Sequence, residues 1–120
     1  MKKSLYSSIK FACEGLAHLI RTERNFRIQL IVAIVAVVAG AFFRITAVEW
    51  LFVASAIFRV LGHESVNTSV ELLSDECEHK QDLNIKHIKD MSAAYVLLSA
   101  IYSLIVAVVI FLPRILQYIR

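Results

Sequence analysis

Apolar residues are concentrated in three stretches of this chain, at about residues 26–43, 46–73 and 91–112. The first contains the uninterrupted run IQLIVAIVAVVAGAFF, and the third carries no charged residue before Pro113. Each stretch has about the length that a helix needs to cross the hydrocarbon core of a bilayer. The pattern therefore predicts three transmembrane helices, with a tight connection at RITAVEW (44–50) and a helix stop at Pro113.

The N-terminal segment, at about residues 1–22, is amphipathic rather than continuously apolar. Its apolar residues recur at the spacing of one helical face, namely Leu5, Ile9, Ala12, Leu16, Leu19 and Ile20. Lysine and arginine residues lie among them, which is typical of a helix on a membrane surface. An amphipathic helix that packs on other helices would show the same spacing. We therefore predict a helix that lies on the membrane surface, packs on the other helices, or does both.

The composition is that of a membrane protein built from helices. Hydrophobic residues make up 58% of the 120-residue chain, whereas soluble domains contain about 45–50%. Three glycines and one proline leave little material for β-turns. The expected fold class is therefore all-α, in a single integral-membrane domain over residues 1–120. The net charge of +3 comes without the dense basic stripe of a nucleic-acid-binding protein, so we expect no nucleic-acid partner.

The distribution of positive charge predicts the orientation in the membrane. Nine basic residues lie in the N-terminal segment and the 75–90 loop, namely Lys2, Lys3, Lys10, Arg21, Arg24, Arg27, Lys80, Lys86 and Lys89. Three lie on the opposite side, namely Arg44, Arg114 and Arg120. Loops rich in lysine and arginine stay in the cytoplasm. The N-terminus and the 75–90 loop are therefore predicted to be cytoplasmic, on the side where ATP is found.

The second apolar stretch ends in HESVNTSVELLSD (63–75), which is unusually polar for a membrane helix. Counted from Glu64, polar residues follow at offsets of 3, 4, 7 and 11, which are Asn67, Thr68, Glu71 and Asp75. These offsets fall on one face of an α-helix. Ionisable groups in a membrane helix are energetically costly and by default indicate a functional site. The alternative is a polar helix end that reaches into water.

Phosphoryl transfer to an alcohol is one chemistry that suits these residues. It needs a metal to neutralise the triphosphate, a base for the hydroxyl proton and positive charge to hold the phosphates. Mg²⁺ is usually held by one or two carboxylates with phosphate oxygens, which Glu23 and Glu71 would supply. Glu64 lies about two helical turns deeper than Glu71, where a lipid hydroxyl would arrive, and Lys89 would hold phosphate. The chain has no Walker A loop, and a proton or cation path lined by Glu64 and Glu71 fits equally well.

Three segments of the chain match motifs that occur together in one known family. Glu64 to Asp75 matches the signature E-x-x-N-[ST]-A-x-E-x-x-x-D, with Ser69 in place of the usual alanine. TERNFRI (22–28) is similar to an E-x-N-x-R-I segment, and IKDMSAAYV (88–96) to an A-K-D-x-x-[AS]-A-A-V segment. In this order and spacing, over about residues 7–112, the motifs resemble the integral-membrane diacylglycerol kinase and undecaprenol kinase family of bacteria.

This resemblance implies an activity and a role for each candidate residue. Glu64 would be the general base, Glu23 and Glu71 would bind Mg²⁺ together with ATP, and Asn67 would support the site. Lys89 and Asp90 would contact the nucleotide.

The same resemblance implies an assembly and a location. The family has three membrane helices and a surface helix per subunit, and it forms homotrimers with sites between subunits in the bacterial inner membrane. Its reaction transfers the γ-phosphoryl group of ATP to a lipid alcohol. ERNFRI (23–28) and VEW (48–50) look more like the undecaprenol kinase branch than the diacylglycerol branch.

Several positions depart from the family pattern. Arg59, Gly62 and His63 stand where the family has plain apolar residues, and Tyr95 replaces a small residue. Arg59, His63 and Asn67 are spaced four residues apart and share a helical face. A charge near the middle of a span needs a partner, which we expect Arg59 to find as a carboxylate or polar group of a neighbouring subunit. Two alternatives stay open: a small oligomeric membrane protein for ion transport or assembly, and a degenerate kinase relative disabled at Arg59 and His63.

Overall fold

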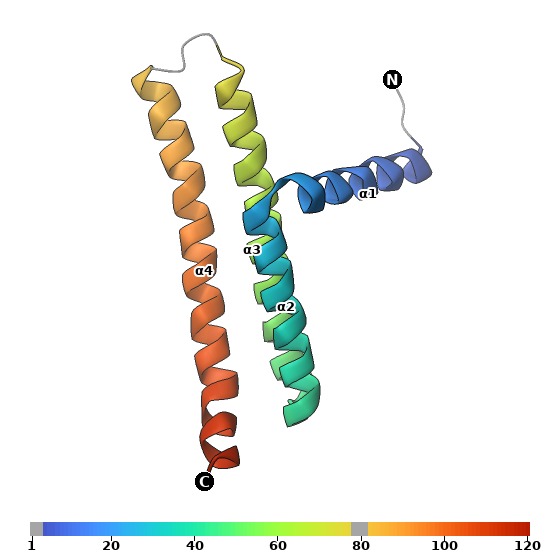
Figure 1. Cartoon of the computed structure of the whole chain (residues 1–120), viewed down its shortest axis with the longest axis vertical. Coiled ribbons are helices and arrows are strands. Elements are labelled where there is room, and N and C mark those ends of the chain that lie inside the picture. Colours follow the sequence, from blue (N-terminus) through green and yellow to red (C-terminus); the bar gives the residue numbers. More distant parts are fainter. Residues whose placement is uncertain (1–3, 78–81) are drawn as a thin grey trace.

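The computed structural model describes residues 4–77 and 82–120, and the described chain is helical apart from short connections (Figure 1). Its helices are α1 (Leu5–Thr22), α2 (Arg24–Phe43), α3 (Ala47–Asp75) and α4 (Leu83–Tyr118). The all-α prediction is therefore confirmed. Figure 1 shows α2, α3 and α4 running lengthwise and α1 projecting sideways from them. Lys2, Lys3 and Lys80 from the charge count lie outside the described residues.

Within the described chain, α2 and α4 are long and apolar enough to cross a membrane. Their apolar side chains are widely exposed, as at Val38 (62%) and Val109 (66%). A soluble protein would bury such surfaces, whereas lipid tails cover them in a bilayer. The second predicted span, at 46–73, corresponds to α3, which does not meet the same measure of length and apolar character because it contains Arg59, His63 and Glu64.

The predicted loop at 75–90 is wrong in its second half. Asp82 begins α4 early, because its carboxylate accepts a hydrogen bond from the Asn84 backbone N–H at 2.8 Å. Such a cap satisfies a backbone donor that the first turn of a helix leaves without a partner. Lys89 and Asp90 therefore lie on the first turns of a helix and not in a loop.

The predicted helix stop at Pro113 is also wrong, because α4 continues to Tyr118. Proline removes only one backbone donor, and neighbouring contacts hold the helix across this point. The Arg114 guanidinium donates to the Ile110 carbonyl at 2.8 Å and to both carboxylate oxygens of Glu49 at 2.7 Å. This bidentate ion pair fastens the C-terminal part of α4 to the start of α3.

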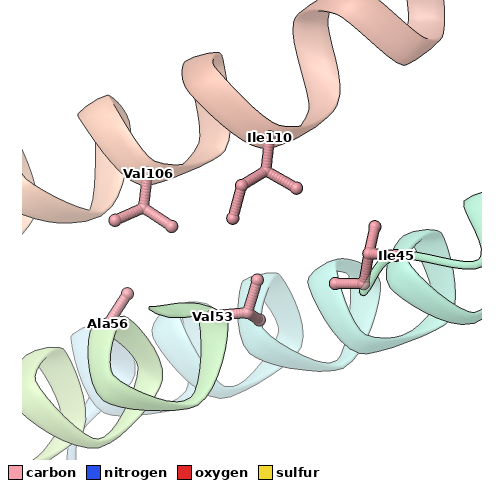
Figure 2. Packing of buried hydrophobic residues seen from close by; sticks show 5 residues of the cluster. All are labelled: Ile45, Val53, Ala56, Val106 and Ile110. Atoms are coloured by element: carbon pink, nitrogen blue, oxygen red, sulfur yellow. The ribbon is translucent and has the colours of Figure 1, made fainter. Parts of the chain in front are cut away.

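The hydrophobic core lies at the end of the bundle away from the α3–α4 connection. Figure 2 shows Val106 and Ile110 of α4 facing Val53 and Ala56 of α3, beside Ile45 from the α2–α3 connection. That connection is tight because Arg44 adopts a left-handed conformation with φ of 54°. The Ile45 backbone N–H then donates to the Gly40 carbonyl at 3.2 Å, and its side chain turns into the core.

Gly40 is expected to be intolerant of a side chain. A Cβ atom there would lie 2.6 Å from Cη2 of Trp50 and 3.1 Å from Cδ1 of Ile45. Gly40→Ala should therefore destabilise the protein by about 1–3 kcal/mol through overpacking, measured as thermal unfolding in detergent. Gly62→Ala is the matched control, since no atom of the described residues lies within 4 Å of its Cβ position, and it should raise stability by about 0.5–1 kcal/mol. Equal melting temperatures for the two variants would contradict this packing.

Candidate functional site

Glu64 is a buried carboxylate in the middle of the bundle. It lies on α3 with 5% of its surface exposed, and Nε2 of Gln29 on α2 donates to its Oε2 at 3.4 Å. A buried carboxylate is costly unless it is hydrogen-bonded or given another partner. A single long hydrogen bond leaves most of its acceptor capacity available to a ligand.

Glu23 occupies the bend between α1 and α2. Its backbone is extended, with φ of −109° and ψ of 110°, so it interrupts what would otherwise be one long helix. Arg27 fixes the bend, because its Nη1 donates to the carbonyls of Ile20 and Arg21 at 2.9 and 3.0 Å. These are carbonyls that the end of α1 leaves without helical partners. The bend holds the half-buried Glu23 at the top of α2.

Three carboxylates gather in this region. The charges of Glu71 and Glu23 both act on Glu64, although the three residues come from α3 and the α1–α2 bend. Glu71 lies two turns beyond Glu64 on the same face of α3, about 10 Å along the helix axis. The predicted base and both predicted metal ligands are therefore close enough to interact electrostatically.

The donor set fits Mg²⁺, although the described residues contain no cluster of three histidine, cysteine or acidic side chains that could hold a metal. Mg²⁺ is usually bound by one or two carboxylates together with phosphate oxygens and water, so Glu23 and Glu71 suffice in kind and number. Among the described residues, two buried amide oxygens have no hydrogen-bond partner: Oδ1 of Asn67, one turn from Glu64 on α3, and Oε1 of Gln29, whose amide nitrogen donates to Glu64. Such oxygens can accept a hydrogen bond from a ligand or from metal-bound water.

Lys89 and Asp90 lie at the end of the bundle where α3 and α4 are connected. Lys89 Nζ forms an ion pair with Asp75 Oδ1 at 3.3 Å, and Lys86 Nζ pairs with Asp90 Oδ2 at 2.7 Å. The Lys86 ammonium group holds the pKa of the Asp90 carboxyl below its ordinary value. In the described chain, these ion pairs do not include Glu23, Glu64 or Glu71. The residues predicted to contact the nucleotide therefore form a second group, at the C-terminal end of α3 and the N-terminal end of α4.

An apolar groove of about 360 Å³ runs between α2, α3 and α4. Its walls are mainly alanine, valine and leucine side chains, with Gln29 as a polar member. Gln29 also donates to Glu64, so the groove and the buried carboxylate share a residue. Apolar grooves with a few placed polar groups are typical of ligand sites.

Sequence reasoning missed Gln29 and the contacts of Arg59. Gln29 was part of the first apolar stretch, where it is a polar residue in an otherwise apolar run, and that contrast was the available signal. Arg59 finds a partner in its own chain, because its guanidinium carbon lies 5.0 Å from the centre of the Tyr102 ring. This cation–π contact is favourable where water is excluded.

Comparison with known proteins gives one family and two similar relatives. The sequence profile described as prokaryotic diacylglycerol kinase matches residues 10–111. Undecaprenol kinase from Bacillus subtilis (strain 168) is 29% identical over 109 residues, which are 91% of this chain and 89% of that protein. Diacylglycerol kinase from Synechocystis sp. is 29% identical over 115 residues, which are 95% of this chain and 66% of that protein.

Proposed function

Because this chain belongs to the prokaryotic diacylglycerol kinase family, a family of membrane lipid kinases, we propose that it phosphorylates undecaprenol with ATP as the donor. Diacylglycerol is the second candidate, since relatives named for either lipid are 29% identical to this chain. Undecaprenol is favoured because the chain spans 89% of the undecaprenol kinase and 66% of the diacylglycerol kinase. The ERNFRI and VEW segments support the same choice.

The observation that carries the proposal is the position of Glu64. It is buried and hydrogen-bonded to Gln29, which also lines the apolar groove. A lipid chain in this groove would present its hydroxyl group to the carboxylate. Glu64 then acts as the general base: it takes the hydroxyl proton while the hydroxyl oxygen bonds to the γ-phosphorus. The bond between this phosphorus and the β–γ bridging oxygen breaks, and ADP leaves.

The remaining predicted residues hold the donor. Glu23 and Glu71 would bind the Mg²⁺ that neutralises the charge of the triphosphate. Asn67 supports the site through its unpartnered amide oxygen. Lys89 and Asp90 contact the nucleotide at the ends of α3 and α4, with Lys89 holding phosphate.

The proposed assembly is a homotrimer in the bacterial inner membrane, with one kinase domain over residues 1–120. α2, α3 and α4 cross the bilayer, and α1 lies on its surface, which agrees with its sideways direction in Figure 1. The N-terminus and the α3–α4 connection face the cytoplasm, in accordance with the excess of lysine and arginine there. In this orientation the C-terminal end of α3 and the N-terminal end of α4 reach the aqueous side of the membrane where ATP is available.

The first test is phosphate transfer from labelled ATP in mixed micelles that contain Mg²⁺ and either undecaprenol or diacylglycerol. We expect both rates to be measurable and kcat/KM to be higher for undecaprenol. A higher kcat/KM for diacylglycerol would indicate that diacylglycerol is the preferred acceptor. No transfer to either lipid by the folded protein would contradict the proposed activity and support a disabled relative.

Lys89→Gln should raise KM for ATP by about tenfold, because a hydrogen bond to a charged group contributes about 1.5–3 kcal/mol. Lys89 also forms an ion pair with Asp75, so Asp75→Asn separates the two roles. If Lys89 binds phosphate directly, Asp75→Asn should change KM much less than Lys89→Gln does. Equal increases would show that Lys89 acts through the ion pair alone.

A further inference from the structure

His63 precedes Glu64 in the sequence but contacts a different helix. Its ring stacks on the Tyr95 ring of α4, with centroids 3.7 Å apart and planes inclined by 30°. Its Nδ1 also shares a hydrogen bond with Oγ of Ser99, which is 3% exposed. His63 therefore makes two contacts with α4, whereas Glu64 accepts a hydrogen bond from Gln29 of α2.

The two residues belong to different faces of α3. Val53, Ile57 and Val60 line the groove, and Glu64 continues this face at helical spacing. Ser55, Arg59 and His63 recur every fourth residue on another face. Because a helix is rigid over one turn, fixing the side chain of His63 against α4 also fixes the direction in which Glu64 points.

The contacts of this second face form a row between α3 and α4. One turn before His63 on α3, Arg59 lies over the ring of Tyr102, whose hydroxyl is 2.9 Å from Oγ of Ser55. An interhelical hydrogen bond contributes about 0.6 kcal/mol on average in a membrane. The energy of these contacts is therefore modest, but together they specify one rotation of α3 against α4.

We propose that His63, stacked on Tyr95 and hydrogen-bonded to Ser99, is a positioning residue that sets the rotation of α3 and directs Glu64 toward the lipid hydroxyl. The inference rests on the proposed role of Glu64 as the base. Rates are sensitive to such placement, since a displacement of about 1 Å lowers them by about 10²-fold. His63 touches neither substrate in this scheme and acts only through Glu64.

The test compares variants by their steady-state kinetics, with ATP varied at saturating lipid. His63→Ala should lower kcat by about tenfold or more and leave KM for ATP within about twofold of the wild-type value, because the nucleotide residues lie elsewhere. His63→Asn can restore the hydrogen bond to Ser99, and His63→Phe can restore the stack on Tyr95. At least one of them should recover part of the lost kcat. Ser69→Ala is the control, because it removes a hydrogen bond to the Ser65 carbonyl within α3 and leaves the described contacts with α4 in place, so kcat should be unchanged.

A double-mutant cycle with Glu64→Gln separates positioning from folding. If His63 acts through Glu64, His63→Ala should cause no further loss of kcat in the Glu64→Gln background. An equal loss in both backgrounds, or a wild-type kcat for His63→Ala, would overturn the proposal. A wild-type kcat for Glu64→Gln alone would instead refute the proposed base, and the two failures are therefore distinguishable.

Discussion

Glu64→Gln is expected to lower kcat by about 10²–10⁴-fold, which is the contribution typical of general acid–base catalysis. Glutamine has nearly the same shape and keeps a polar group beside Gln29, but it cannot take a proton from the lipid hydroxyl. The nucleotide residues are unchanged, so the Kd for ATP should stay near the wild-type value. Single-turnover phosphate transfer and equilibrium ATP binding, measured on the same preparation, test both expectations.

Glu14→Gln is the matched control for this substitution. Glu14 is an exposed carboxylate on α1, outside the site, and its variant should retain the wild-type kcat. A loss of ATP binding together with kcat in Glu64→Gln would indicate a nucleotide ligand and not a base. Retention of kcat would exclude Glu64 from proton transfer.

Removal of divalent metal is expected to abolish phosphate transfer, and added Mg²⁺ should restore it. Glu71→Gln and Glu23→Gln should each raise the Mg²⁺ concentration for half-maximal rate by at least about tenfold, since even residues behind the ligands commonly change metal affinity by 10–100-fold. The physical reason is the loss of one negative charge from a site that uses only one or two carboxylates. Titration of the rate with MgCl₂ at fixed ATP, after dialysis against EDTA, measures the shift.

Glu76→Gln provides the comparison for the metal titration. Glu76 is an exposed carboxylate one residue after α3, so its loss changes the net charge equally without removing a proposed ligand. Its Mg²⁺ titration should coincide with that of the wild type. If the Mg²⁺ titrations of Glu71→Gln and Glu23→Gln also coincide with that of the wild type, the metal is held by other groups.

The helical fold followed from the sequence where apolar periodicity was continuous. The boundary between the segment at 1–22 and the span at 26–43 was expected, as was a tight connection beginning at Arg44, because charged residues separate apolar runs there. The two ends of α4 were not. A single cap at Asp82 extends the helix into a polar segment, and the ion pair of Arg114 with Glu49 accompanies its passage through Pro113. The ion pair joins residues 65 positions apart, which a local pattern does not contain. The cap at Asp82 is a local contact, but it lies in a polar segment without apolar periodicity.

The candidate site was predictable in its residue types and less so in its partners. Spacing placed Glu64 and Glu71 on one face of α3, and in the structure the charge of the predicted ligand Glu23, at the α1–α2 bend, also acts on Glu64. Gln29 could not be assigned to Glu64, because they are separated by 35 residues and meet only when α2 packs on α3. His63 and Tyr95 stood out as departures from the family pattern, but their contact depends on the rotation of α3 against α4.

The bend at Glu23 has a consequence for membranes of different thickness. If α1 rests among the lipid headgroups, it anchors the molecule to one leaflet, and the nearby carboxylates keep a fixed depth below that surface. Hydrophobic mismatch is then absorbed at the opposite end, around the α2–α3 turn, by tilting or local thinning of the bilayer. The hydroxyl groups of lipids in the anchored leaflet would stay level with Glu64, whether the acyl chains around the protein are short or long.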